Sequence, residues 1–236
     1  MEEELLIDES LVPDPDENQE MGARDIAPIA DEDLKGSRFL LVRRSVEPMD
    51  LDGSLGGAVE LACTFQPASG ARFTWAQLVL RLTAPERSFF IDVAPHDVRE
   101  GEPVRFTVDV KGKLGLKYSP VEASGEGGEK TEFAVYHCPV QGSGSGTALA
   151  RWDFRENPHT RNGLGQDQSL TLTLPFTGKV SADVRVATRV ARGGLAGAIE
   201  GIRDLILRPD AKRYTVSFEI PERQDRTVWA RFLRTT

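Results

Sequence analysis

The sequence predicts an all-β fold, an antiparallel β-sandwich of about ten strands with one inserted amphipathic helix and a disordered acidic N-terminal arm. Three observations support this prediction. Apolar and polar residues alternate in many short runs, as expected of strands with one buried face. Gly, Pro, Asn and Asp separate these runs at a spacing typical of sandwiches. Helical spacing of apolar residues is found in one stretch, 194–207, which disfavours a parallel α/β fold.

The densest apolar run, 75–83, is a predicted strand and lies within the stretch 72–110, which we expect to form part of the central sheet. Its residues Leu78, Leu80 and Leu82 occupy one face of a ribbon with a period of two residues. The other predicted strands share this alternation and comprise residues 39–42, 58–65, 88–93, 103–110, 114–118, 130–139, 147–154, 169–174, 179–191 and 213–220.

Residues 179–191 are predicted to pair with 213–220, because both runs alternate and flank the same connection. That connection is the predicted helix 194–207, which ends before Pro209. Its apolar positions follow helical spacing and include Leu195, Ile199, Ile202, Leu205 and Ile206. Such a helix either covers one end of the sandwich or contacts a partner or a membrane.

Residues 1–37 form the predicted disordered arm, and residues 38–236 form the predicted sandwich domain. The arm carries 13 acidic and 2 basic residues, with prolines and only short apolar clusters between them. Such a segment cannot bury enough apolar surface to offset the entropy lost on ordering. We interpret it either as a solubilising tail or as a docking or autoinhibitory peptide.

Charge and composition restrict the class of protein. The net charge is -8, but the residues after the arm are nearly balanced, with 27 basic and 24 acidic side chains, which disfavours a nucleic-acid partner. No apolar run has the length of a membrane-spanning helix, and no secretory signal is recognisable. Two cysteines are too few for a disulfide framework. We therefore expect a soluble, cytoplasmic protein, with peripheral membrane contact left open.

No motif in the sequence predicts catalysis, a cofactor or a metal site. The three histidines, His96, His137 and His159, stand apart, and the neighbouring His137 and Cys138 would point to opposite faces of a strand. The glycine-serine run 142–146 lacks the lysine and the following helix of a phosphate loop, so we interpret it as a hairpin connection. We expect no enzymatic activity and no cofactor.

One set of residues resembles the order of signals in immunoglobulin variable domains, namely a cysteine, a tryptophan, a tyrosine corner before a second cysteine, and a final strand. The matching positions are Cys63, Trp75, Tyr136, Cys138 and the run 144–149. The resemblance implies a disulfide between Cys63 and Cys138. We do not assign the chain to this family, because strand-like runs continue well beyond Trp152 and any sandwich with two buried cysteines gives the same spacing. Whether the cysteines pair stays open.

The best candidate site is the loop that follows the strand 147–154, because aromatic, acidic, basic and imidazole groups occur together where the strand ends. The candidate binding residues are Trp152, Asp153, Arg155, His159 and Arg161. The alternation that defines this strand aligns Ala148, Ala150, Trp152 and Phe154. An exposed charged loop without a binding role is the alternative.

These features predict a non-enzymatic protein-binding or assembly module that contacts other proteins through the arm, the 152–165 loop or the helix. The first alternative is a membrane-active protein that inserts helix 194–207 after a trigger. The second is a small enzyme that uses Asp153, His159 and Arg161. The oligomeric state and the identity of a partner do not follow from the sequence.

Overall fold

The computed structural model describes residues 3–14, 29–98, 104–109, 130–135, 137–157, 161–165, 167–193, 199–207 and 214–222. Most of these residues lie in strands, and every strand pairing is antiparallel, which confirms the predicted all-β class. The strands are β1 (Glu4–Ser10), β2 (Val12–Pro13), β3 (Arg38–Leu51), β4 (Ser54–Gln66), β5 (Ala71–Ala84), β6 (Asp92–Ala94), β7 (Val104–Asp109), β8 (Lys130–Val135), β9 (Val140–Ser143), β10 (Leu149–Arg155), β11 (Asp167–Leu174), β12 (Gly178–Gly193), β13 (Ile199–Ile206) and β14 (Tyr214–Ile220).

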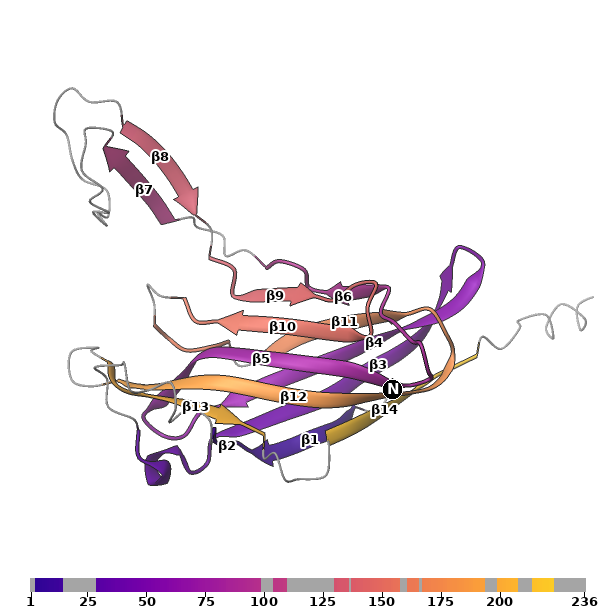
Figure 1. The fold of residues 1–236 in the computed structure, drawn as a ribbon, viewed down its shortest axis with the longest axis horizontal. Helices are drawn as coiled ribbons and strands as arrows, with labels where there is room; N and C mark the ends of the chain where they lie inside the picture. Colours follow the sequence, from indigo (N-terminus) through magenta and orange to yellow (C-terminus); the bar gives the residue numbers. More distant parts are fainter. Residues whose placement is uncertain are drawn as a thin grey trace, which may run out of the picture.

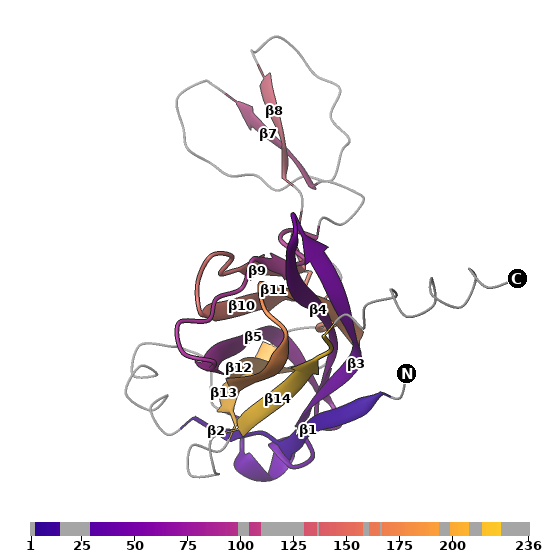
Figure 2. The same cartoon turned by 90° about the vertical axis from the view of Figure 1, so that its right-hand side faces the viewer.

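The strands form two main sheets and one separate pair (Figure 1). The first sheet has five strands in the order β1-β3-β4-β11-β6. The second has seven strands, in which β2-β13-β12-β5-β10-β9 are neighbours and β14 also pairs with β12. Buried residues of both sheets belong to one hydrophobic core, and the view in Figure 2 shows the two sheets on either side of it.

Alternation along the strands decides which side chains enter this core. On β5, Leu78 and Leu80 are fully buried, and on β11 Leu170, Leu172 and Leu174 are fully buried as well. The residues between them face outward, because successive side chains of a strand point to opposite faces. The period-two pattern of the sequence therefore places the leucines of β5 and β11 in the core.

An aromatic cluster joins the two sheets at one end of the body. The ring of Phe65 on β4 lies 5.3 Å from that of Phe39 on β3. The same ring makes edge-on contacts with Phe73 on β5, at 5.9 Å, and with Phe154 on β10, at 5.2 Å. Aromatic pairs in such tilted arrangements stabilise a core beyond the area that they bury.

Strand β12 is the central strand of the seven-stranded sheet. One edge of it pairs with β5, and the other edge pairs first with β14 and then with β13. The register that joins Gly178 to Ile220 and Val184 to Tyr214 confirms the predicted pairing of 179–191 with 213–220. A single long strand thus holds three others in register.

The predicted helix 194–207 is wrong. Residues 199–206 form strand β13, and residues 194–198 lie outside the described residues. Strand β14 pairs only with the first half of β12, from Gly178 to Val184. The same backbone edge in the second half of β12 pairs with β13, from Ala187↔Ile206 to Gly193↔Ile199. Backbone pairing along this open edge outweighs the local helical spacing of the apolar residues.

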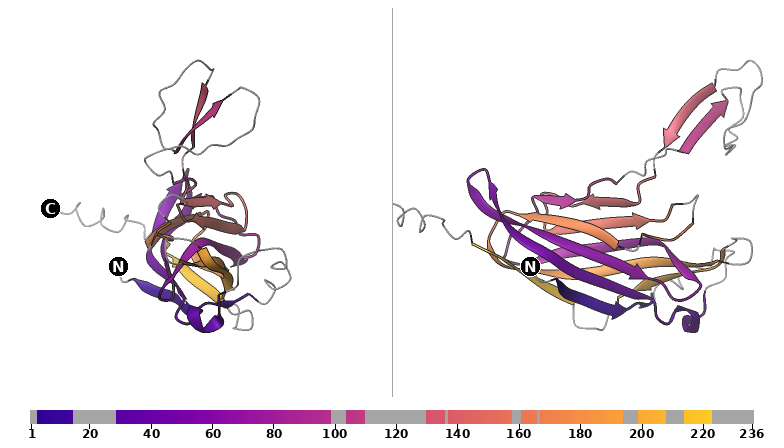
Figure 3. Two further views of the ribbon diagram at one scale, coloured as in Figure 1. Left: turned by 90° about the vertical axis from the view of Figure 1, so that its left-hand side faces the viewer. Right: turned by 180° about the vertical axis from the view of Figure 1, so that it is seen from behind.

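The predicted disordered arm is wrong for residues 3–14 and 29–37. Strand β1 extends the five-stranded sheet beside β3, and β2 extends the seven-stranded sheet beside β13 (Figure 3). Ile7 and Leu11 are buried in the common core. Residues 31–34 form a short 3-10 helix whose Leu34 is also buried. Residues 15–28 lie outside the described residues.

Four acidic side chains of this segment have basic partners, which the charge count of the sequence did not reveal. The ion pairs are Asp8 with Arg38, Glu4 with Arg43, Glu3 with Arg44, and Asp33 with Arg192. Each pair is substantially exposed and therefore contributes little by itself. Burial of Ile7 and Leu11 supplies the main stabilisation, and the charges complement the arginines of β3 and β12.

Two predicted strands differ in extent from the observed ones. The predicted strand 88–93 contributes only its last two residues to β6. Its first residues form a loop in which Ser88 and Phe90 are buried. The amides of Phe90 and Ile91 in this loop donate to the carbonyls of Thr147 and Thr173 and do not form a continuous strand pairing. The predicted strand 39–42 is much shorter than the observed β3, because β3 and β4 form one long hairpin down to the pair Leu51↔Ser54. The predicted strand 114–118 lies outside the described residues.

Candidate functional site

A two-stranded ribbon, β7 with β8, is separate from both main sheets. Figures 1 and 3 show it projecting from the body. One series of register pairs is Val104↔Val135, Phe106↔Phe133 and Val108↔Thr131. The alternate series is Arg105↔Ala134, Thr107↔Glu132 and Asp109↔Lys130. Since alternate residues share a face of a ribbon, the register separates a mainly apolar series from a mainly polar one.

The ribbon is joined to the body at a narrow base. Val98 and Val140 form an isolated bridge, in which the Val98 amide donates to the Val140 carbonyl at 3.0 Å. The Gly142 amide donates to the carbonyl of His96 at 3.1 Å. The chain segments entering and leaving the ribbon are therefore held side by side where they meet β6 and β9. Residues 99–103, 110–129 and 136 lie outside the described residues.

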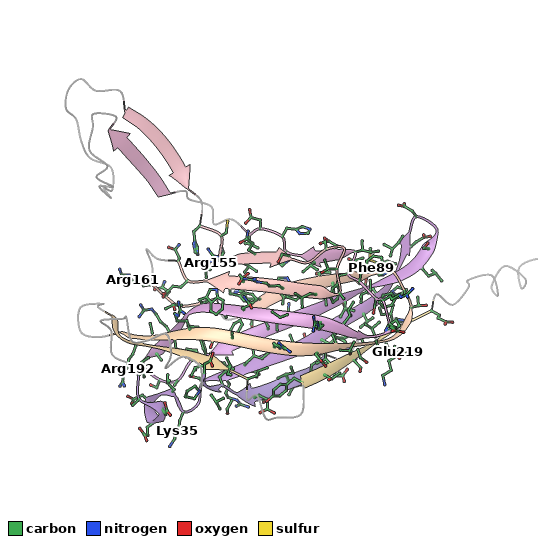
Figure 4. All side chains as sticks on the ribbon, in the orientation of Figure 1. Lys35, Phe89, Arg155, Arg161, Arg192 and Glu219 are labelled. Carbon is green, nitrogen blue, oxygen red and sulfur yellow. The ribbon has the colours of Figure 1, made fainter. Side chains whose placement is uncertain are left out.

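The predicted binding loop does not form a single site. Trp152 is fully buried, and its indole Nε1 donates to the Ala94 carbonyl at 3.1 Å, so this side chain is part of the core. Arg155 and Arg161 are exposed, and Figure 4 shows both on the same end of the body. His159 lies outside the described residues. The described residues therefore do not show whether Asp153, His159 and Arg161 come together, as the enzyme hypothesis requires.

Asp153 lies on the outer face of the seven-stranded sheet, where it contacts its strand neighbours. Arg151 donates to its carboxylate through Nε at 2.7 Å and through a second guanidinium nitrogen at 2.9 Å, and Gln77 Nε2 donates at 3.0 Å. The hydrogen bond to Asp153 is the main reason why the pKa of Arg151 lies above its usual value. The Asp153 carboxylate thus accepts hydrogen bonds from Arg151 and Gln77 on the outer face of the sheet.

The residues of the predicted helix are divided between the strand and the part of the chain that is not described. Leu195 lies outside the described residues, and Ile199 and Ile202 are paired in β13 with Gly193 and Ala191. Leu205 is fully buried, and its carbonyl accepts a hydrogen bond from the Thr188 hydroxyl at 3.1 Å. Ile206 is half-buried. Leu205 is thus a core residue, and the predicted membrane-contacting helix face does not exist.

A cavity of about 580 Å³ opens at the end of the body where the β4–β5 turn meets the 162–167 loop. Sequence reasoning missed this feature. The loop overlaps the candidate loop 152–165 of the sequence, but the β4–β5 turn is remote from it along the chain. Only the pairing of β11 with β4, which sets Asp167 beside Thr64, brings the two segments together.

Cys63 and Cys138 are not joined to each other, so the disulfide implied by the immunoglobulin resemblance does not form. Cys63 is buried on β4, whereas Cys138 is half-buried in the segment between the ribbon and β9. Burial, with a smaller contribution from the charge of Asp167, raises the pKa of the Cys63 thiol well above its usual value. The thiolate of Cys63 is therefore scarcely populated in the folded protein.

We expect a Cys138→Ala variant, in which Cys63 is the remaining cysteine, to resist a thiol-specific reagent at about pH 8 until it is unfolded. Labelling followed with and without guanidinium chloride measures this directly. The Cys63→Ala variant, labelled under the same native conditions, shows how fast the half-buried Cys138 reacts. Fast labelling of native Cys138→Ala would contradict the burial of Cys63.

Within the described residues, no group of three or more His, Cys, Asp or Glu side chains is arranged to hold a metal ion. The same part of the chain contains no helix with the length and apolar character needed to span a membrane.

Comparison with known proteins gives structural neighbours but no family. No protein-family model matches the chain, and no curated protein sequence matches it. Among solved structures, Clostridium perfringens delta-toxin has 9% identity and a TM-score of 0.31, with 78% of this chain and 89% of that chain covered. The membrane-inserted form of the Clostridium perfringens NetB toxin has 8% identity and a TM-score of 0.23, covering 76% and 94%. A structure described as a pore forming protein has 9% identity and a TM-score of 0.28, covering 78% and 92%.

These neighbours disagree with two predictions from the sequence. The predicted soluble protein-binding or assembly module does not agree with them, since they are described as two toxins, one in a membrane-inserted form, and a pore forming protein. The predicted cytoplasmic location does not agree with the membrane-inserted form among these neighbours. At TM-scores below 0.5 the neighbours do not establish a common fold, so the function must be argued from this chain's own geometry.

Proposed function

We propose that this protein is a membrane-active, non-enzymatic protein in which a β-sandwich body carries the β7–β8 ribbon to a lipid bilayer. The observation that supports the proposal is the ribbon itself: it pairs with neither main sheet, and its register separates an apolar from a polar series. The sequence left membrane activity open as an alternative, with helix 194–207 as the inserted element. In the present proposal the inserted element is the β7–β8 ribbon.

A two-stranded ribbon that stands apart from a body is marginally stable in water. A bilayer offers its apolar series a favourable environment, provided that every backbone hydrogen-bonding group is satisfied. Two strands alone leave two open edges, so ribbons from several copies of the chain have to pair side by side and close into a barrel. The polar series then faces the lumen, and the apolar series faces lipid.

The two strands of the ribbon are shorter than a transmembrane strand, but the alternation in the amino-acid sequence extends beyond them. Transmembrane strands need about 9–11 residues, whereas β7 and β8 have 6 residues each. The alternation in the amino-acid sequence continues beyond β7, with Val110, Leu114, Leu116 and Tyr118 at every second position apart from Gly112. Residues 104–118 thus carry the alternating signature of a membrane-spanning strand.

The proposal is tested by adding the full chain to phosphatidylcholine vesicles, with and without an anionic lipid, that contain a self-quenched dye. We expect dye release from at least one of the two compositions. The matched control lacks residues 99–136, with Val98 joined to His137 by a short glycine-serine linker. The bridge between Val98 and Val140 already holds these ends together, so the body should fold in the control.

The control variant is expected to unfold at the same temperature as the intact chain and to release no dye. Failure of the intact chain both to sediment with the vesicles and to release dye would refute the proposal. Equal release by the chain and by the ribbon-deleted control would show that another part of the body acts on the membrane.

A further inference from the structure

The cavity at the β4–β5 end of the body is constructed from two segments that the fold holds in fixed positions. Residues around the β4–β5 turn form one wall, and the loop before β11 forms the other. Figure 4 places Arg161, which precedes the second wall, at the end of the body opposite Phe89. The lining includes Thr64, Gln66, Pro67, Arg72, Asn162 and Asp167.

A nearly buried carboxylate fixes the shape of this loop. Glu156, with 9% of its side chain exposed, accepts hydrogen bonds at Oε1 from Arg72 Nε at 2.7 Å and from the Gly163 amide at 2.8 Å. The Leu164 amide donates to the Phe73 carbonyl at 3.0 Å. Charge-assisted hydrogen bonds of this kind are short and strong, so the second wall of the cavity is anchored to β5.

Gly163 is required where the loop crosses β5. Its φ of +80° lies in the left-handed region, and a Cβ there would meet Arg72 Cβ at 3.3 Å. Glycine alone adopts this conformation without steric cost. The local sequence therefore permits the loop to approach β5 closely enough to reach Glu156.

The cation in the lining of the cavity is already paired with a carboxylate. Arg72 pairs with Glu156, and Asp167 accepts a hydrogen bond from the Thr64 hydroxyl at 2.7 Å. An anionic ligand would find no uncompensated cation among these residues, and a buried unpaired charge would be costly. The groups left for a ligand are the amides of Gln66 and Asn162, both exposed, beside the apolar surface of Pro67 and its neighbours.

Two exposed amides beside a small apolar surface suit a ligand with many hydroxyl groups, because an amide and a hydroxyl group can each donate and accept hydrogen bonds. A volume of about 580 Å³ lies within the range of small-molecule sites. We infer that this cavity binds an uncharged saccharide. The site goes beyond the proposed membrane activity, because it would hold a sugar whether or not the ribbon enters a bilayer.

Calorimetry and saturation-transfer NMR on the full chain test this inference without any membrane. The probes are the methyl glycosides of glucose, galactose, mannose and N-acetylglucosamine, with sialyllactose and phosphocholine as charged probes. We expect at least one uncharged glycoside to bind and both charged probes to bind more weakly. Asn162→Ala or Gln66→Ala should weaken the binding about two- to tenfold, the effect of one lost hydrogen bond.

The matched control is Gln141→Ala, an exposed amide on β9 that does not line the cavity, and it should bind like the original chain. Three outcomes would overturn the inference: no binding of any uncharged glycoside, tighter binding of a charged probe, or binding that both cavity variants leave unchanged. Because the probes are soluble, none of these outcomes bears on dye release from vesicles.

Discussion

Phe106→Asp is expected to reduce dye release from vesicles at least tenfold while leaving the body folded. Phe106 belongs to the apolar series of the ribbon and is paired in register with Phe133. A carboxylate on the lipid face of a membrane strand is unfavourable by about 1–2 kcal/mol or more in each copy, and every copy in a barrel would carry it. A difference of 1.4 kcal/mol already corresponds to about a tenfold change in an equilibrium.

The matched control is Thr107→Asp, one residue further along the same strand and in the polar series. It introduces the same charge, but on the face that the proposal assigns to water, so dye release should change by less than about twofold. Circular dichroism and thermal unfolding of both variants should match the original chain, because the ribbon is outside both main sheets. Equal loss of activity in both variants would contradict the assignment of the two faces.

Trp152→Ala should lower the free energy of unfolding by about 3–5 kcal/mol, as expected for truncation of a buried aromatic side chain. Trp152 is fully buried on β10, and its indole Nε1 bonds to the Ala94 carbonyl. In a domain of this size the loss corresponds to roughly 6–20 °C in Tm. Chemical denaturation followed by far-ultraviolet circular dichroism measures the change.

Arg155→Ala is the comparison, because Arg155 is on the same strand and is exposed. We expect its free energy of unfolding to stay within about 0.5 kcal/mol of the original, as for most surface substitutions. The sequence grouped both residues as candidate binding positions, and this pair separates a core side chain from a surface one. A small effect of Trp152→Ala would place that side chain outside the core.

The burial of Trp152 could have been predicted from the alternation in the sequence. Ala150, Trp152 and Phe154 lie on the same face of a strand, and all three are buried. The adjacent charged residues suggested a binding site because aromatic groups often occur in such sites. Alternation was the more reliable of the two signals, since it follows from the geometry of the strand, whereas the clustering of residue types says nothing of direction.

The predicted helix failed because a short run of apolar residues fits two periods. Ile199, Ile202, Leu205 and Ile206 follow helical spacing, and the sequence also contains no proline between them to exclude a strand. The choice between the two depended on β12, whose free edge accepts β13. No local pattern in residues 194–207 contains that information.

Local alternation in the sequence determined the all-β character of the chain, the inward direction of the leucines on β5 and β11, and the pairing of β12 with β14. These follow from neighbouring residues alone, since side chains alternate along any strand. The tertiary structure alone decided the rest: that acidic β1 lies against the arginines of β3, that β13 is a strand, and that β7 and β8 stand apart from the sheets. Each of these depends on which backbone edges remain open once the other strands have paired, and that is a property of the whole chain.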